Sequence, residues 1–584
     1  MRSESLVRIA AVDELAGDGP FALSPDGCDV ALVRTRSGWR AFQGHCPHQG
    51  ALLGEGEVEG ETLVCRNHRW RFSLSSGQRL GGPQCLASCP VAERDGAIYV
   101  DLSGLKPVVE RRAATRSLDD LPGPRPLPFL GNAPQIDAAR AHLVLEGWIR
   151  QFGPIYQLRL AGRRLFVTSS PDLIEGVLRA RPETFSRSSR SNAALAEAGI
   201  KGVFNAEGDA WRPQRKLAVS ALAQRHLKEL FPHIRTVAMR LRKRWDAAAA
   251  SGAPLDIVDE MKRFTVDVTM LIAFGHDSNT VEQSDDFIQR HLELVLPTIS
   301  RRTLATFPIW RYFRRPQDRR FDRALTALRK WLAKLLQDTR ERLRSDPARR
   351  ARPTNFIEAM IVAVDENGEP FSDETIMSNL LTMLLAGEDT TAFTLAWAVH
   401  ELCESPQWRD ALRREADAIL GDADAPDDIE AANRLPVAAA VANETMRLRP
   451  VAPAIGATAN VDTSLGDYFL PKGSTVMLLT RPSALEARNF ADPLAFRPDR
   501  WLEGAAGAHD ISTFLPFGSG PRMCPGRSLA LIEMKTVLSL MFRNFDLERV
   551  GDAKEVAERF GFTVSPVGLR VRLKARDEAR KEFA

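Results

Sequence analysis

Two Cys and two His near the start of the chain have the spacing of metal ligands. Cys46 and His48 form a C-x-H pair, Cys65 and His68 form a C-x-x-H pair, and 16 residues separate the two pairs. Four ligands from two short loops can close one site. Equal numbers of thiolate and imidazole suit either tetrahedral zinc or a [2Fe-2S] cluster with two Cys on one iron and two His on the other.

The mixture of ligands within each loop favours the cluster. Zinc modules commonly pair like ligands, whereas each loop here contributes one Cys and one His. In "CPH", "CRNHRWRF" and the following "GGP", residues 5 to 102 resemble a Rieske ferredoxin domain. The resemblance implies a Rieske-type [2Fe-2S] cluster on the four ligands. No extra Cys stands beside them, so the segment resembles the low-potential type of Rieske domain, which donates electrons.

A further candidate ligand is Cys524, in "FGSGPRMCPG", on a tight turn expected to open a helix. Backbone N–H groups and the positive end of that helix would stabilise a thiolate there. Taken alone, the residue could equally be a buried, inert Cys. The segment matches F-x-x-G-x-R-x-C-x-G as Phe517, Gly520, Arg522, Cys524 and Gly526, and so resembles the haem-binding loop of the cytochrome P-450 family. This resemblance implies haem b with Cys524 as the iron ligand.

Further segments of that family follow in the right order. "ETMRLRP" supplies Glu444 and Arg447 one helical turn apart, and "FRPDRW" supplies Arg500, which together resemble the family's structural Glu-Arg-Arg network. "WRPQR" supplies Trp211 and Arg215, which resemble the pair that meets a haem propionate. An E-x-x-R match alone is a common surface ion pair, but the joint resemblance spans residues 121 to 573.

One departure concerns the propionates. Many family members carry an Arg or His a few residues after the second Pro of a segment like "RPVAPAIGATANVD", but this sequence has Ala457, Thr458 and Ala459 there. We therefore expect propionate neutralisation to fall to Arg215 and Arg522.

The segment "AGEDTT", Ala386 to Thr391, resembles the oxygen-activating part of the family's long central helix. The chemistry needs a gap beside the haem, a hydroxyl at bound dioxygen and an acid that passes protons. Thr390 and Asp389 fit these two roles as catalytic residues. The alternative for Thr390 is a hydrogen bond back to its own helix carbonyl, a frequent fate of helical Thr.

The elements that position these residues divide the chain in two. Residues 1 to 105 alternate in short apolar runs, which predicts a small all-β domain. Residues 106 to 118 are polar and predict a linker. Residues 119 to 584 show long helical periodicity, as in residues 321 to 343, with strand-like pieces such as "RRLFVTS" and "STVMLLT". The fold class expected is a multidomain one, a Rieske domain followed by a mainly α (α+β) cytochrome P-450 fold.

Composition limits the partners. A net charge of +4 from 79 basic and 75 acidic residues gives no basis for nucleic-acid binding. The most apolar run, residues 379 to 402, contains Glu388 and Asp389, so no membrane span is expected. The N-terminus shows no signal-peptide pattern, and seven Cys suit cofactor ligation over a disulfide framework. We expect a cytoplasmic protein.

Together these features predict a haem-thiolate monooxygenase that uses O2 on a hydrophobic small molecule. The sequence contains no G-x-G-x-x-G fingerprint, so an NAD(P)H-dependent flavoprotein ferredoxin reductase is the expected electron source. Variable segments 187 to 204 and 299 to 310 are expected to line the substrate pocket. Alternatives are a redox or gas sensor without turnover, a peroxide-driven haem-thiolate enzyme, and a Rieske non-haem iron oxygenase, for which the remaining His show no suitable pair.

Charge also predicts how the two domains would meet. Glu55, Glu57, Glu59 and Glu61 alternate, so in an extended segment they would form an acidic stripe beside the cluster loops. The expected counterparts are basic residues on or near the helix that starts with "WRPQRK": Arg212, Lys216, Arg225 and Lys228. The alternative is an ordinary solvated strand face.

Overall fold

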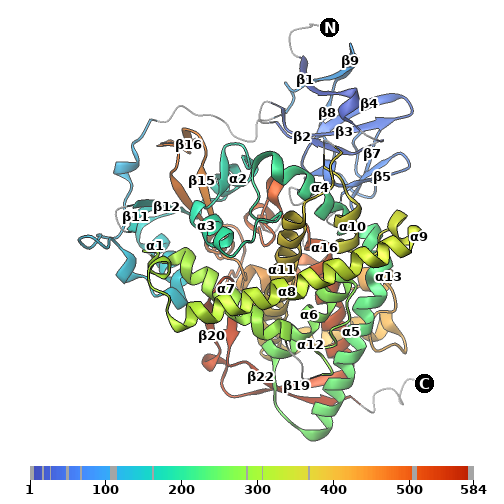
Figure 1. The fold of residues 1–584 in the computed structure, drawn as a ribbon, viewed down its shortest axis with the longest axis vertical. Coiled ribbons are helices and arrows are strands. Elements are labelled where there is room, and N and C mark those ends of the chain that lie inside the picture. The colour runs from blue at the N-terminus through green and yellow to red at the C-terminus, as the bar shows by residue number, and fades with distance from the viewer. Residues whose placement is uncertain are drawn as a thin grey trace.

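The computed structural model describes residues 6–15, 17, 19–25, 28–47, 51–65, 69–105, 115–160, 163–283, 287–305, 307–365, 368–502 and 509–576. His48, His68 and most of the expected linker lie outside these ranges. A β-rich N-terminal domain sits on one end of a larger, mostly helical domain (Figure 1). This arrangement agrees with the expected fold class.

The N-terminal domain consists of three small antiparallel sheets, with strand orders β1-β10-β9, β2-β3-β4-β8 and β5-β6-β7. Its strands are β1 (Leu6–Ala11), β2 (Phe21–Leu23), β3 (Val30–Thr35), β4 (Gly38–Gln43), β5 (Glu57–Glu59), β6 (Thr62–Val64), β7 (Arg71–Ser73), β8 (Ser88–Cys89), β9 (Val91–Arg94) and β10 (Ala97–Asp101).

Strand β3 shows why the sequence folds this way. Its run "VALV" is buried on both faces, and because side chains alternate along a strand, Val30 and Leu32 enter one apolar cluster while Ala31 and Val33 enter another. The second cluster lies beneath the loops that begin at Cys46 and after Cys65. One face of the strand therefore packs in the same cluster as Cys46 and Cys65, two of the expected iron–sulfur ligands.

The larger domain is built from helices, of which α6, α11 and α16 matter most for the site. The helices are α1 (Ala141–Phe152), α2 (Pro171–Arg179), α3 (Ser189–Glu197), α4 (Trp211–Ala221), α5 (Gln224–Ser251), α6 (Ile257–Phe274), α7 (Phe287–Leu304), α8 (Pro316–Ser345), α9 (Pro347–Ala351), α10 (Phe356–Val362), α11 (Asp373–Cys403), α12 (Pro406–Leu420), α13 (Ile429–Asn433), α14 (Pro436–Leu448), α15 (Arg481–Ala484) and α16 (Arg527–Asn544).

The strands of this domain include one mixed sheet of order β11-β12-β18-β15-β13. Both strand-like segments singled out in the sequence are strands here, as β12 and β18. The bounds are β11 (Ile155–Leu160), β12 (Arg163–Thr168), β13 (Phe185–Arg187), β14 (Leu255–Asp256), β15 (Ala454–Ala459), β16 (Thr463–Leu465), β17 (Tyr468–Leu470), β18 (Thr475–Leu479), β19 (Phe545–Val550), β20 (Ala557–Phe560), β21 (Val564–Val567) and β22 (Arg570–Ala575).

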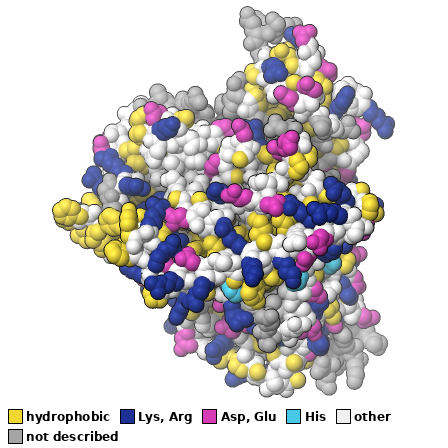
Figure 2. Space-filling view, viewed as in Figure 1, with side chains coloured by type: hydrophobic (Ala, Val, Ile, Leu, Met, Phe, Trp, Pro, Cys, Tyr) yellow, Lys and Arg dark blue, Asp and Glu magenta, His cyan; other side chains and the backbone are white. Residues whose placement is uncertain are grey.

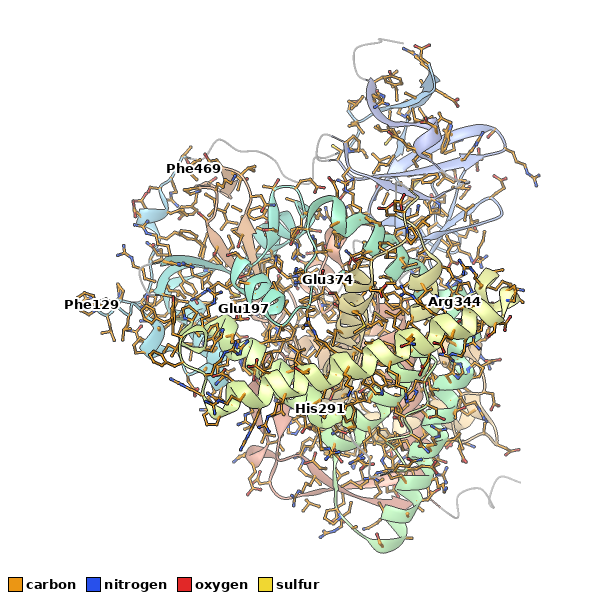
Figure 3. All side chains as sticks on the ribbon, in the orientation of Figure 1. Phe129, Glu197, His291, Arg344, Glu374 and Phe469 are labelled. Atoms are coloured by element: carbon orange, nitrogen blue, oxygen red, sulfur yellow. The ribbon has the colours of Figure 1, made fainter. Side chains whose placement is uncertain are left out.

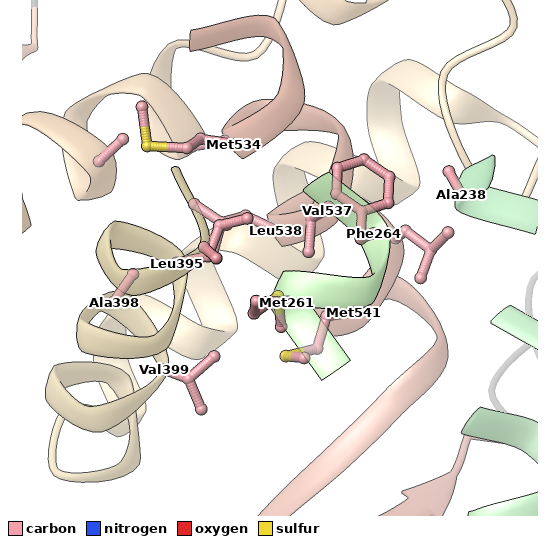
Figure 4. Packing of buried hydrophobic residues seen from close by; sticks show 14 of the residues in the cluster. Ala238, Met261, Phe264, Leu395, Ala398, Val399, Met534, Val537, Leu538 and Met541 are labelled. Carbon is pink, nitrogen blue, oxygen red and sulfur yellow. The ribbon is translucent and has the colours of Figure 1, made fainter. Parts of the chain in front are cut away.

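Helix α11 runs through the centre of this domain. Its side chains are buried around most of its circumference, as expected for a helix enclosed by others. Leu395 of α11 packs in one cluster with Phe264 of α6 and Val537 and Met541 of α16 (Figure 4). These three helices pack together in the centre of the domain.

The surface is charged over the long helix α8, where Lys and Arg side chains gather (Figure 2). Hydrophobic side chains collect at one edge, where Phe129 points away from the ribbon (Figure 3) and is 95% exposed. Among the described helices, none is long and apolar enough to cross a membrane.

Candidate functional site

Two loops of the N-terminal domain place Cys46 and Cys65 side by side. The Cys46 N–H donates to the Ala51 carbonyl at 2.8 Å, and the Cys65 N–H donates to the Trp70 carbonyl at 2.9 Å. Each Cys therefore stands at the base of a short loop that backbone hydrogen bonds close. Both Cys are buried in one apolar cluster, which brings together the two Cys that the sequence proposed as ligands.

The two His of the set lie within these closed loops, at positions outside the described residues. Arg69 ends the second loop with a positive φ of 54°, unusual for a residue with a side chain. Its guanidinium bonds to Glu57 and Glu59 of β5, which ties the loop to that strand.

The loop around Cys524 has the backbone conformation that its glycines permit. Gly518 and Gly520 adopt φ values of 74° and 70°, and a Cβ on Gly520 would lie 2.6 Å from the Leu178 carbonyl oxygen. The Cys524 N–H donates to the Phe517 carbonyl at 2.9 Å, so Phe517 and Cys524 close the loop. Helix α16 begins three residues later, and its positive end favours a thiolate at Cys524.

A gap exists beside α11 at the expected oxygen-activating turn. Ala386 is exposed although the residues before and after it on this central helix are largely buried, so open space lies beside the helix at this turn. The Thr390 hydroxyl donates to the Ala386 carbonyl at 2.9 Å. This is the helix-bonded arrangement considered as the alternative, and it leaves the Thr390 oxygen as a hydrogen-bond acceptor.

The acid next to Thr390 belongs to a buried charge cluster. Asp389 lies 3.1 Å and Glu388 lies 3.4 Å from Nζ of Lys262 on α6. Burial and the charge of Asp389 raise the pKa of Glu388 to about 8, and burial also raises the pKa of Asp389 above its ordinary value, although Lys262 opposes this shift. Sequence reasoning missed Lys262, since nothing in its helix marks it as facing α11.

Four arginines gather in the region where the sequence placed only Arg215 and Arg522. Burial and the charges of neighbouring arginines lower the pKa of Arg181 to about 10 and that of Arg187 to about 9. Burial also lowers the pKa of Arg522, and the charge of Arg215 adds to that effect. Within the described chain, Nε of Arg181, Arg215 and Arg522 and Nη1 of Arg522 are buried without hydrogen-bond partners.

The position of Arg187 explains the missing cation of the sequence motif. Strands β13 and β15 are antiparallel, and Arg187 lies directly opposite Ala457. Opposed residues of an antiparallel pair share one face of the sheet. Arg187 therefore places a guanidinium on the sheet face of Ala457, where its Nε donates to the Phe204 carbonyl at 2.8 Å. The segment "RPETFSR" held the only sequence signal, two Arg in a short stretch before a strand.

Trp211 and Arg215 occupy the first turns of α4, and each meets the Cys524 loop. The guanidinium of Arg522 lies 4.5 Å from the centre of the Trp211 ring, a cation–π contact. Arg215 Nη1 donates to the Met523 carbonyl at 2.6 Å. Both residues that the sequence assigned to the propionate are thus placed beside the loop of the expected iron ligand.

The Glu-Arg-Arg network predicted from the sequence is present. Arg447 Nη2 lies 2.7 Å and Arg500 Nε lies 3.3 Å from Oε1 of Glu444, and the indole of Trp501 donates to the same carboxylate at 2.9 Å. All three charged side chains are buried. The network fixes α14 against the segment that leads to the Cys524 loop.

The two domains touch through the candidate sites themselves. Met523, the neighbour of Cys524, is 4% exposed and packs in the apolar cluster that contains Cys46 and Cys65. Glu55 accepts hydrogen bonds from Arg215 Nη2 at 3.0 and 3.2 Å. The sequence expected other partners for the acidic stripe.

Glu59, Arg212 and Lys228, three other members of the expected charge pairing, pair within their own domains. Glu59 contacts Arg69 and Arg71 of the N-terminal domain. Arg212 pairs with Glu183 at 3.3 Å and Lys228 pairs with Glu430 at 2.7 Å. The expected pairing was therefore wrong. Glu55 does pair across the domain boundary, but with Arg215, which was not among the expected partners, while Glu59, Arg212 and Lys228 have oppositely charged partners within their own domains.

Comparison with known proteins agrees with this geometry. The cytochrome P450 family model matches residues 121–573, and the Rieske [2Fe-2S] domain model matches residues 5–91. The chain belongs to the cytochrome P450 family and carries a Rieske [2Fe-2S] domain ahead of the P450 domain. The P450 domain implies a haem, and the Rieske domain implies a [2Fe-2S] cluster. The unpaired guanidinium donors fit the two propionates of such a haem, because a buried cationic cluster requires anions.

Curated relatives match this chain over most of its length. "Self-sufficient cytochrome P450 monooxygenase CYP505E4" of Penicillium expansum is 27% identical over 471 residues, which cover 78% of this chain and 43% of that relative. Human cytochrome P450 4F8 is 26% identical over 68% of this chain and 78% of its own length. Human mitochondrial 25-hydroxyvitamin D-1 alpha hydroxylase is 27% identical over 75% of this chain and 89% of its own length. The chain thus spans less than half of the Penicillium relative.

Proposed function

We propose that this chain is a monooxygenase whose Rieske cluster passes electrons, one at a time, to the haem of the same chain. When bound through Cys524, the haem supplies the activation of O2, so that one oxygen atom enters a hydrophobic organic substrate and the other leaves as water. The overall reaction consumes two electrons and two protons. A [2Fe-2S] cluster carries one electron at a time, which suits this demand.

The observation that carries the proposal is the contact between the two sites. Met523, covalently next to Cys524, shares one apolar cluster with Cys46 and Cys65. A redox sensor without turnover would not need Thr390 and Asp389 beside a gap in α11. A peroxide-driven enzyme would have no use for a donor domain seated on its Cys524 loop.

In this proposal Asp389 and Thr390 deliver protons. The Thr390 hydroxyl proton is engaged by the Ala386 carbonyl, so its oxygen accepts a hydrogen bond in the gap. Asp389 is held by Lys262, which we assign as the residue that positions the acid. Because the pKa of Asp389 is raised, its carboxyl can hold and release a proton closer to neutral pH than an exposed Asp can.

The remaining site residues bind the haem. We assign Arg181, Arg187, Arg215 and Arg522 to its propionates, with Trp211 stacking on Arg522, and Phe517 and Gly526 shaping the loop. A Cβ on Gly526 would lie 3.8 Å from Cys524 Sγ, so glycine keeps the space next to the sulfur open. The cluster ligands in this assignment are Cys46, His48, Cys65 and His68.

An NAD(P)H-dependent flavoprotein ferredoxin reductase is the proposed electron source. A cleft of about 2500 Å³ runs between the domains and is lined by Leu52, Gly54 and Val64 of the Rieske domain. The edges of the ligand loops are therefore open to an approaching partner while Met523 stays buried. We place the domain limits at residues 1–105 and 119–584, and the protein in the cytoplasm.

The substrate is proposed to be hydrophobic and to lie beside segments 187 to 204 and 299 to 310. These segments are adjacent, because Trp310 donates to Glu197 of α3 (labelled in Figure 3) at 2.8 Å and Arg190 donates to the Ala305 carbonyl at 2.7 Å.

The test of the proposed reaction is turnover with isotopically labelled O2. Substrate-binding difference spectra against fatty acids, terpenoids and other apolar metabolites would first select a ligand. Its product should then carry one labelled oxygen atom when the reductase supplies electrons. Product that carries oxygen from water, or no product at all with any tightly bound ligand, would contradict the monooxygenase assignment.

A further inference from the structure

The contact between the domains has an apolar and a charged half. The apolar half is Met523, which packs among the buried hydrophobic side chains of the Rieske domain, with Phe517 packed against the same group. Phe517 begins the loop that closes at Cys524, and Met523 directly precedes Cys524. The Rieske domain therefore rests on both ends of the haem-ligand loop rather than on a distant part of the P450 domain.

The charged half is one ion pair that crosses the domain boundary. Glu55 follows directly on the loop after Cys46, and it accepts both hydrogen bonds from Arg215 Nη2. The two side chains are 13% and 8% exposed. At this burial a charge pair with two hydrogen bonds is far stronger than an exposed pair, and removing one partner leaves the other charge desolvated.

Arg215 also binds the loop of the haem ligand. Its Nη1 donates to the Met523 carbonyl at 2.6 Å, and its Nε is buried without a described partner. One guanidinium thus joins Glu55 of the Rieske domain to the backbone next to Cys524. A displacement of Glu55 would be transmitted to the position of Met523.

We propose that Glu55 is a positioning residue that, through Arg215 and Met523, seats the Rieske domain on the haem-ligand loop in its electron-transfer position. The proposal rests on the relay described above and specifies what holds the donor in place. Electron transfer slows steeply as donor and acceptor separate, so a loosened contact between the domains lowers the rate of haem reduction while both cofactors stay bound.

The test compares full-length holoprotein carrying Glu55→Gln, Glu55→Asp or Glu93→Gln with the wild type. Glu93 lies exposed on β9 of the same domain, so its variant is a matched loss of charge away from the seat. Flash photoreduction of the cluster, with carbon monoxide as a trap for reduced haem, measures the internal transfer rate. Hydrogen–deuterium exchange of peptides covering residues 51 to 57 and 515 to 526 reports how stably the two domains contact each other, independently of activity.

We expect Glu55→Gln to slow internal haem reduction about tenfold or more, and to increase exchange in both peptides. Glu55→Asp should recover most of the rate because it keeps the charge, and Glu93→Gln should match the wild type. If Glu55→Gln reduced its haem and exchanged the amides of both peptides at the wild-type rates, the proposed positioning role of Glu55 would be wrong. That outcome differs from failure of the relay, in which Cys46→Ser protein would still reduce its haem at the wild-type rate.

Discussion

Arg187 lies directly opposite Ala457 on the antiparallel strands β13 and β15. The segment after "RPVAP" has Ala457 where many family members carry a cation, and in our proposal Arg187 supplies that charge from the neighbouring strand. The assignment can be tested by moving the positive charge from position 187 to position 457.

Arg187→Ala should release haem faster than the wild type, by roughly tenfold, because one buried charge-assisted contact to a propionate is lost. The double variant Arg187→Ala with Ala457→Arg should recover much of the retention. The measurement is transfer of haem to excess apomyoglobin. Arg570→Ala, an exposed change on β22, is the control, and equal release from Arg187→Ala and this control would contradict the assignment.

Glu444→Gln should destabilise the P450 domain by about 3–5 kcal/mol, because it leaves Arg447 and Arg500 buried without a counter-charge. Urea denaturation followed by haem absorbance measures the effect. Glu548→Gln, whose carboxylate is exposed and pairs with Lys574 at 3.5 Å, should change stability by less than about 0.5 kcal/mol. Similar losses in both variants would mean that the network is not the main support.

Thr390→Ala should keep haem and substrate binding but divert electrons from product to peroxide, since the hydroxyl oxygen that accepts a hydrogen bond in the gap is gone. We expect the yield of product per NAD(P)H to fall at least roughly tenfold. Thr390→Ser retains the hydroxyl and should stay near the wild type. Unchanged coupling in Thr390→Ala would remove the residue from proton delivery.

Stability should depend on pH through Glu533, a buried carboxyl on α16. Burial raises its pKa to about 8, although a hydrogen bond from Thr391 opposes the shift. The folded state keeps this proton while the unfolded state loses it near its ordinary pKa, so stability falls as pH rises from about 4.5 to 8.

Glu533→Gln removes the titrating carboxyl, so the free energy of unfolding should fall less steeply as pH rises, by up to about 1.4 kcal/mol per pH unit. Urea midpoints of the two proteins across pH 5 to 8, on the scale set by the ordinary and raised pKa values, provide the comparison. Parallel curves would show that the carboxyl ionises in the folded state as readily as in the unfolded one.

Much of the site could be predicted because its residues are encoded in local motifs. Cys46 and Cys65 are marked by their spacing to a nearby His, Cys524 stands on a turn between glycines, and Glu444 and Arg447 lie one helical turn apart. Hydrophobic periodicity similarly located α8 and the strands β12 and β18.

The missed features all depend on contacts between distant segments. The register of β13 against β15 decides that Arg187 faces Ala457, and the packing of α6 on α11 decides that Lys262 meets Asp389. Glu55 was singled out, but its partner was Arg215 because Arg212 and Lys228 had closer carboxylates. Periodicity and spacing carry no information on such pairings.

The central claim, that the Rieske cluster reduces the haem of its own chain, is tested most directly with Cys46→Ser in the full-length protein. Loss of one cluster ligand should abolish turnover driven by the reductase while peroxide-driven turnover, which needs no donor, continues at the wild-type rate. Iron analysis should show about three irons per chain in the wild type and about one in the variant. Undiminished reductase-driven turnover in protein that lacks the cluster would contradict the account.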